Sequence, residues 1–291
     1  MIILTPPPFN EYELLDSGNG YRLERFGANI VARPDASCVW KQAQPENQWE
    51  QANAYFKKLP DGKSMWQKSM FKEEWFFKIP PFSKTAKHSI VASLRLAPSV
   101  KNIGIFPENV AHWPWIAHRL SKRKNANVLN LFGYTGLTTL FMANLGASVC
   151  HVDASKPSVE WAKRNQDLSK MNDAAIRWIV DDCTKFVHRE VKRGMKYDAI
   201  IMDPPAFGRD NKGNVFEFEK RIGDLLELCK KALSPRPLFF VFNGYSMGYS
   251  STVLANLLND HFPEQQIEHG ELHLREVNDE RSLPCSIFAR F

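Results

Sequence analysis

From about residue 125 onward, short apolar runs alternate with segments of helical periodicity, and this alternation limits the fold of the chain most strongly. The apolar runs span residues 127–132, 148–152, 176–180, 199–202 and 238–242. Strands that alternate with helices predict a parallel sheet covered on both faces. Two further strand-like runs, residues 267–274 and 286–291, come after the alternation ends, so we expect an antiparallel pair at the sheet edge. The predicted fold class is α/β, with a Rossmann-like sheet of seven strands.

The first part of the chain has a different pattern. Short strand-like runs at residues 21–26, 29–33, 75–79 and 89–94 are separated by turns, and Gly18-Asn19-Gly20 predicts a hairpin. One or two helices are expected near residues 49–59. We therefore predict a smaller β-rich N-terminal domain at residues 1–107, with substrate recognition as its expected role, and an α/β domain at residues 108–291.

Charge and cysteine content limit the class of protein. The 38 basic and 32 acidic residues give a net charge of +6, which permits an anionic partner such as RNA without requiring one. The five cysteines are far apart and form no CxxC pair, which indicates a reduced, cytoplasmic protein. We expect no signal peptide, no membrane segment and no metal, because neither the apolar runs nor the histidines have the patterns that these require.

A glycine-containing turn follows the first strand of the α/β part. The run 128–132 leads directly into Gly133-Tyr134-Thr135-Gly136 and then into a helical segment. Glycines at such a turn let the backbone approach a ligand closely, and the helix start offers free N–H groups. The turn has GxxG rather than GxGxxG, which counts against a nicotinamide-dependent oxidoreductase.

Acidic residues follow the next three strands. Asp153 lies 20 residues beyond Gly133, where a βαβ unit places an acid against ribose hydroxyls. Asp182 could accept a hydrogen bond from an adenine amino group or cap the helix that follows it. Two prolines stiffen the turn after Asp203 and hold this residue and Phe207 at the carboxyl edge of the sheet, where open α/β sheets bind ligands.

At this point the motifs resemble those of a known family. VLNLFGYTG, VDAS, DDCTKF and DPPAFGR resemble motifs I to IV of class I S-adenosylmethionine-dependent methyltransferases. More narrowly, the chain from about Gly104 resembles the bacterial 23S ribosomal RNA large-subunit methyltransferases that modify cytosine C5 or guanine N7. The segment IGIFPENVAHW resembles the turn before motif I, with Asn109 at a position where the family has glutamine. The opening YELLDSGNGYRLERFG resembles a subgroup that lacks the extra N-terminal RNA-binding module.

The resemblance implies S-adenosylmethionine as the cofactor and assigns roles to individual residues. The turn of residues 132–136 would hold the methionine end, Asp153 the ribose and Asp182 the adenine. Asp203 would orient an amino group or accept its proton, and Phe207 would stack on an extruded base. The implied cofactor site comprises Phe106, Asn109, Phe132, Gly133, Tyr134, Thr135, Gly136, Asp153, Asp182, Cys183, Asp203 and Pro204.

Two departures from the family pattern bear on the substrate. Asn130 replaces the aspartate of motif I and removes a negative charge beside the cofactor. Cytosine C5 methylation needs a cysteine nucleophile after the fifth strand, but FVFNGYSMGYS has none, while Cys183 and Cys285 are interpreted as structural. Cytosine C5 is therefore disfavoured, and Tyr245 is a candidate for the acceptor side.

The expected function is methylation of an RNA base, with ribosomal RNA favoured by the resemblance. Two alternatives remain open from the sequence. One is a methyltransferase that acts on a protein or a small molecule. The other is a non-catalytic RNA-binding or assembly factor that retains the cofactor fold.

Overall fold

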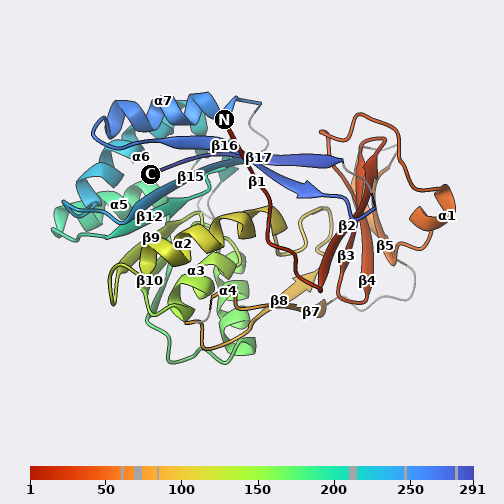
Figure 1. Cartoon of the computed structure of the whole chain (residues 1–291), viewed down its shortest axis with the longest axis horizontal. Coiled ribbons are helices and arrows are strands. Elements are labelled where there is room, and N and C mark those ends of the chain that lie inside the picture. Colours follow the sequence, from red (N-terminus) through yellow and green to blue (C-terminus); the bar gives the residue numbers. More distant parts are fainter. Residues whose placement is uncertain (60–61, 69–73, 84, 210–214, 246–247, 279–280) are drawn as a thin grey trace.

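The computed structural model describes the chain except for residues 60–61, 69–73, 84, 210–214, 246–247 and 279–280. Figure 1 shows a large sheet with helices on both faces and, beside it, a smaller sheet built from the N-terminal part of the chain. In the described residues, no helix has both the length and the apolar character needed to cross a lipid bilayer.

The large sheet confirms the predicted α/β alternation. Its strand order is β1-β16-β17-β15-β12-β9-β10-β11, and the strands from β15 to β11 run parallel to one another. The elements of this part are β1 (Ile2–Leu4), the 3-10 helix η1 (Pro107–His112), α2 (Trp113–Leu120), β9 (Asn127–Leu131), α3 (Leu137–Asn144), β10 (Ser148–Asp153), α4 (Lys156–Leu168), β11 (Ile176–Val180), α5 (Cys183–Lys192), β12 (Ala199–Met202), β13 (Phe207–Arg209), β14 (Val215–Glu217), α6 (Phe218–Ala232), β15 (Phe239–Tyr245), α7 (Ser251–His261), β16 (Glu268–Arg275) and β17 (Ser282–Arg290).

Burial on both faces explains the continuous apolar strands. In β9, Val128 belongs to a core cluster that includes residues of α2 and α3, whereas Leu129 belongs to a second cluster with residues of α5, α6 and α7. Both side chains are fully buried. A parallel strand covered on two faces needs apolar residues at successive positions, which is the pattern seen in the sequence.

The last two strands form the expected antiparallel pair, β16 with β17, but they are not the outermost strands. β1 pairs parallel with β16, so residues 2–4 lie in the large sheet rather than in the smaller one. A side chain at Gly270 would place its Cβ 1.7 Å from the carbonyl oxygen of Ile2, so this glycine permits the pairing. The division of the chain at residue 107 stays a prediction.

The smaller part is β-rich, as the sequence predicted. Strands β2 to β6 form one sheet, and β7 pairs with β8 in a separate hairpin. Gly18-Asn19-Gly20 forms the expected turn between β2 and β3, with positive φ at Asn19 and Gly20. The elements are β2 (Tyr12–Gly18), β3 (Tyr21–Phe26), β4 (Asn29–Pro34), α1 (Glu46–Trp49), β5 (Ala54–Lys58), β6 (Ser64–Lys68), β7 (Glu74–Ile79) and β8 (Ile90–Arg95).

The helical prediction for residues 49–59 is wrong over most of that range. The helix α1 ends at Trp49, and residues 54–58 form β5, which pairs with β6. Ala54 and Phe56 are buried while Lys57 is exposed. This alternation has the period of a half-buried strand, and pairing with a neighbouring strand overrides the local helical preference.

A buried charge cluster lies within the smaller sheet. The carboxylate of Glu24 accepts hydrogen bonds from Arg33 Nε at 2.5 Å and from the Tyr12 hydroxyl at 3.0 Å, and Arg22 Nε lies 3.3 Å away. Burial alone would raise the pKa of Glu24, but Arg22 and Arg33 outweigh burial and lower it. The same two arginines act on the buried carboxyl of Glu108 in η1, so the cluster connects the smaller sheet to the catalytic side of the molecule.

Glu24→Gln should lower the free energy of unfolding at pH 7 by about 3 kcal/mol, because it removes the anion paired with the buried guanidinium of Arg33 and leaves Arg22 with only the more distant Asp35, at 3.6 Å. A lowered carboxyl pKa contributes stability above the pKa of the unfolded state, near 4.3, and this contribution is lost as pH falls through the folded value. Urea denaturation should therefore show that the difference in the free energy of unfolding between wild type and Glu24→Gln shrinks below about pH 4. Glu160→Gln, which removes an exposed pair with Lys156, is the control. Equal stability of the two variants at pH 7 would contradict the role of the cluster.

Candidate active site

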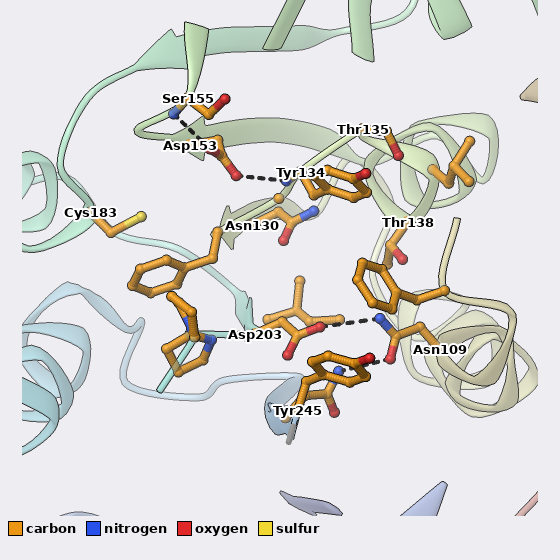
Figure 2. Close-up of a pocket in the computed structure, with 18 of the residues that line it drawn as sticks. Asn109, Asn130, Tyr134, Thr135, Thr138, Asp153, Ser155, Cys183, Asp203 and Tyr245 are labelled. Atoms are coloured by element: carbon orange, nitrogen blue, oxygen red, sulfur yellow. Dashed lines mark hydrogen bonds between the residues drawn. The ribbon is translucent and has the colours of Figure 1, made fainter. Parts of the chain in front are cut away.

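A cavity of about 350 Å³ lies at the carboxyl ends of β9, β10 and β12, with η1 on its other side. This is the edge at which open α/β sheets bind ligands. Figure 2 shows the side chains that converge on it. Every residue of the predicted cofactor site except Gly136 lines this cavity.

The loop of residues 132–136 is held in an unusual backbone conformation. Phe132, Tyr134 and Gly136 have φ angles of 56°, 50° and 75°, and left-handed conformations are rare for bulky residues. A Cβ at Gly133 would lie 2.4 Å from the ring of His151. The loop therefore needs this glycine because a buried histidine packs directly beneath it.

Gly136 lies behind the cavity wall. It is the N-cap residue of α3, and an added Cβ would lie 2.8 Å from the Cβ of Ala162. The structure thus gives Gly136 a packing role between α3 and α4. On this loop, the cavity is lined by residues 132–135, which precede Gly136.

Asn130, the neutral replacement in motif I, points into the cavity at the end of β9 (Figure 2). Its Nδ2 donates to Thr139 Oγ1 at 2.8 Å, and this hydroxyl lies 2.9 Å from His151 Nδ1. Burial lowers the pKa of His151 to about 3, so its ring is neutral at pH 7. The wall beneath the glycine turn is therefore polar but uncharged.

Asp153 connects two backbone segments of the cavity. Its two carboxylate oxygens accept hydrogen bonds from the backbone N–H groups of Tyr134 and Ser155, each at 2.8 Å (Figure 2). Burial raises the pKa of this carboxyl despite these two donors. Each oxygen has a further lone pair that a ligand hydroxyl could use.

Asp182 caps the helix that follows it, which is one of the two roles considered from the sequence, and contact with adenine stays a prediction. Its Oδ1 accepts a hydrogen bond from the backbone N–H of Lys185 at 2.8 Å, which caps α5. The same residue lines the cavity. Helix capping and ligand contact are therefore compatible at this position.

Asp203 has one satisfied and one unsatisfied oxygen. Its Oδ2 accepts a hydrogen bond from Asn109 Nδ2 at 3.2 Å, whereas Oδ1 is buried without a hydrogen-bond partner among the described residues. Burial raises the pKa of Asp203 to about 6, and the nearby Glu108 adds to this effect. The cavity wall therefore contains a desolvated acceptor that no described group uses.

Aromatic rings form one side of the cavity. The ring of Phe106 makes edge contacts with Tyr134 and Tyr245, with centroid distances of 5.6 and 5.2 Å. Phe216 lies in the same lining and packs against Phe132 at 5.1 Å. The sequence did not predict Phe216 as a residue of the site, because its strand has only three residues and its pairing with β13 has no clear sequence signal.

Phe207, a predicted catalytic residue, is not brought to the described cavity lining. It lies in β13, opposite Glu217 of β14, and its side chain is 56% exposed. His112 and Asn243 do line the cavity. The sequence analysis noted neither as a site residue, since each lies inside an apolar segment.

The cysteines and possible metal ligands complete the inventory of reactive groups. All five cysteines lie in the described part of the chain and are free, and Cys183 is the one that lines the cavity. Burial raises the pKa of its thiol well above the ordinary value, and Asp153 adds to the shift. The described side chains contain no group of three or more His, Cys, Asp or Glu residues placed to hold a metal ion.

Comparison with known proteins gives consistent matches over the α/β part. A family model described as RNA cap guanine-N2 methyltransferase matches residues 125–246. A ribosomal RNA large subunit methyltransferase K/L from Desulfotalea psychrophila is 30% identical over 159 residues, 54% of this chain and 21% of the relative. A ribosomal RNA large subunit methyltransferase K from Neisseria meningitidis is 26% identical over 161 residues, 53% and 44% of the two chains. The chain thus matches less than half the length of these curated relatives.

A solved structure extends the match to the whole chain. The S-adenosylmethionine-dependent methyltransferase from Agrobacterium tumefaciens has 34% sequence identity and a TM-score of 0.91. The match covers 100% of this chain and 93% of that one, so it includes the β-rich N-terminal part. The protein therefore belongs to the class I S-adenosylmethionine-dependent methyltransferases, enzymes that use S-adenosylmethionine as methyl donor.

Proposed function

We propose that this enzyme methylates an amino nitrogen on a base of RNA, with ribosomal RNA as the first class of substrate to test. The observation that carries the proposal is the bare Oδ1 of Asp203 in a cavity lined by aromatic rings. The RNA substrate is supported by the names of the relatives and of the family model, which describe methyltransferases that act on RNA. A cytoplasmic location is part of this proposal and agrees with five free cysteines.

The residues at the cavity fit the cofactor. Its volume of about 350 Å³ lies within the usual range for small-molecule sites, and its wall includes both acids expected to contact a nucleoside. In this arrangement Asp153 accepts from the ribose hydroxyls and Asp182 from the adenine amino group. The turn of residues 132–135 holds the methionine end through its backbone.

S-adenosylmethionine supplies a methyl group that is already activated by its sulfonium, so the protein must chiefly position the acceptor in line. Oδ1 of Asp203 accepts a hydrogen bond from one N–H of the amino group and orients its nitrogen toward the methyl group. Transfer would form the nitrogen–carbon bond as the bond from the methyl group to sulfur breaks, with S-adenosylhomocysteine as the leaving group. The nitrogen would then carry a positive charge, and loss of its proton to the Asp203 carboxylate would restore a neutral amine. The carboxylate has the required acceptor capacity, since no described group occupies Oδ1.

Attack at a nitrogen fits this cavity better than attack at cytosine C5. The C5 reaction requires a thiolate that adds to C6 of the base. Cys183 is buried, and the pKa of its thiol is raised well above the usual value, so the thiol stays protonated at pH 7. Cys285 belongs to a separate cluster with Leu14 and Leu283.

Asp153→Ala should weaken binding of S-adenosylmethionine by about tenfold or more, because it removes the acceptor of the ribose hydrogen bonds. Isothermal titration calorimetry measures this change directly. Asp181→Ala is the matched control, since Asp181 ends the neighbouring strand but pairs with Arg189 and does not line the described cavity. Similar affinities for wild type and Asp153→Ala would remove Asp153 from the cofactor site.

The methylation rate should rise with pH through about 6 and then level off, because Asp203 acts in its ionised form and its pKa is about 6. Asp203→Asn should lower kcat by about a hundredfold at pH 7.5, since an amide cannot take up the proton. Single-turnover rates across pH 5 to 9 test both statements. A flat profile, or an Asp203→Asn variant with normal kcat, would contradict this role.

Ribosomal RNA from cells that lack the gene should accept a labelled methyl group when incubated with the protein and S-adenosylmethionine. Nucleoside mass spectrometry should place that group on an exocyclic amino nitrogen, and RNA from cells with the gene should accept little. Labelling of a protein or of a small metabolite instead would replace RNA as the substrate. A product methylated at cytosine C5 would refute the argument from Cys183.

A further inference from the structure

A line of buried polar groups runs from the cavity to the molecular surface behind Asp203. Asn109, which donates to Asp203, accepts in turn from Asn243 Nδ2 at 3.4 Å. The Oδ1 of Asn243 lies 3.0 Å from Nε2 of His112, and Nδ1 of His112 lies 3.3 Å from Nη1 of Arg290. Figure 2 shows the cavity end of this line, where a dashed line joins Asn109 to Asp203.

The chemistry of the two ends fixes the direction of every hydrogen bond in between. A guanidinium only donates, so Nδ1 of His112 must accept from Arg290. A neutral imidazole then carries its proton on Nε2 and donates to Asn243. Each amide passes the direction on, because its oxygen accepts and its nitrogen donates, until the chain ends at a carboxylate that only accepts.

The surroundings support this polarity. Burial and the adjacent Arg290 together lower the pKa of His112 to about 3, so the imidazole is neutral. The His112 ring packs edge to face on Phe288 at 5.1 Å, and the Arg290 guanidinium lies 4.3 Å from the Trp115 ring centroid. Each group is thus held in one orientation by packing as well as by its hydrogen bonds.

The line joins four elements that are distant in the sequence. It begins after β12 at Asp203, crosses η1 and β15, and reaches Arg290 in β17. Arg290 Nε donates to the half-exposed Glu268 of β16 at 2.9 Å. His112, Asn243 and Arg290 are each at most 5% exposed.

We propose that Asn243, His112 and Arg290 are positioning residues that fix the amide of Asn109 and thereby hold one oxygen of Asp203 while the other stays bare in the cavity. This inference rests on the proposed role of Asp203 in accepting an amino group. It also gives a physical basis for selecting an amino group over a carbonyl group of the base. The site offers the substrate a hydrogen-bond acceptor, while the N–H donor of Asn109 points to Asp203 and away from the substrate. A base carbonyl at the same place would meet a carboxylate without a donor and be repelled.

Reversal of the Asn109 amide would change the chemistry of Asp203. Its oxygen would then face the carboxylate, and the acid would lose the one hydrogen bond that lowers its pKa. Glu108 is the charged group that also acts on Asp203, and it raises the pKa. On the other side, Arg290 is influenced by Glu268 and Arg119. Among these groups, Asn109 is therefore the main one that disfavours protonation of Asp203.

The direction of the chain is tested without cofactor or RNA, on the full-length protein. Nitrogen-15 NMR of labelled histidine should show His112 as the neutral tautomer with its proton on Nε2, unchanged from pH 8 to pH 5. A proton on Nδ1, or titration of His112 within this range, would overturn the inference even if every variant failed to fold.

His112→Phe keeps an aromatic ring of similar shape but removes both hydrogen bonds. Carbon-13 NMR of the Asp203 carboxyl, assigned with Asp203→Asn, should show its titration midpoint moved upward by about one pH unit. The pH at which kcat falls on the acidic side of the profile should move upward by the same amount as the Asp203 midpoint. The affinity for S-adenosylmethionine should change less than threefold. A uniform loss of kcat at all pH values, with the acidic fall at the same pH as in the wild type, would mean that His112 is only structural.

His273→Phe is the matched control. His273 is also a buried histidine with two hydrogen-bond partners, Ser282 and Glu271, but it lies outside the chain that reaches Asp203. Its substitution should leave the Asp203 midpoint unchanged. An equal movement of the Asp203 midpoint in His112→Phe and His273→Phe would refute positioning by His112. If the midpoints behave as expected but the wild-type protein does not methylate RNA, only the proposed substrate is refuted.

Discussion

The carboxyl ends of three parallel strands meet at one edge of the large sheet, and the chemistry of the site depends on this convergence. Strands β9, β10 and β12 lie side by side, so the residues that follow them are brought together although they are far apart in the sequence. Asp153 and Asp203 follow strands on opposite sides of β9. If β9 ran antiparallel to these two neighbours, the loop that follows it would lie at the opposite edge of the sheet from both acids.

Desolvation then gives similar side chains different properties at this edge. Asp153 is bound by two backbone donors, whereas Asp203 has a single amide donor and one bare oxygen. The pKa of Asp203 rises to about 6 because burial is opposed only by Asn109. One acid is therefore suited to stable hydrogen bonds with a ligand, and the other to proton transfer.

The sequence was sufficient for features that depend on local pattern. Continuous apolar runs predicted β9, β10 and β12 because each of these strands is covered on both faces, and the acids at their ends were located from strand ends alone. It was insufficient where partners are distant. β1 is three residues long and exists because Gly270 admits it, Phe216 enters the cavity through a short hairpin, and His112 gains its role from contacts across four elements. Such contacts have no periodicity that a single sequence can reveal.

The 3-10 helix η1 shows why the N-terminal sheet belongs to the catalytic unit. Consecutive residues of η1 serve two networks: Glu108 lies within the influence of Arg22 and Arg33, while Asn109 donates to Asp203. Burial raises the pKa of Glu108 and the two arginines oppose this rise, while Glu108 in turn adds to the raised pKa of Asp203. A change in the buried charges of the small sheet must therefore alter the electrostatics of the cavity, because the intervening groups are too buried for water to screen them. The smaller part of the chain thus acts on the cavity through its buried charges.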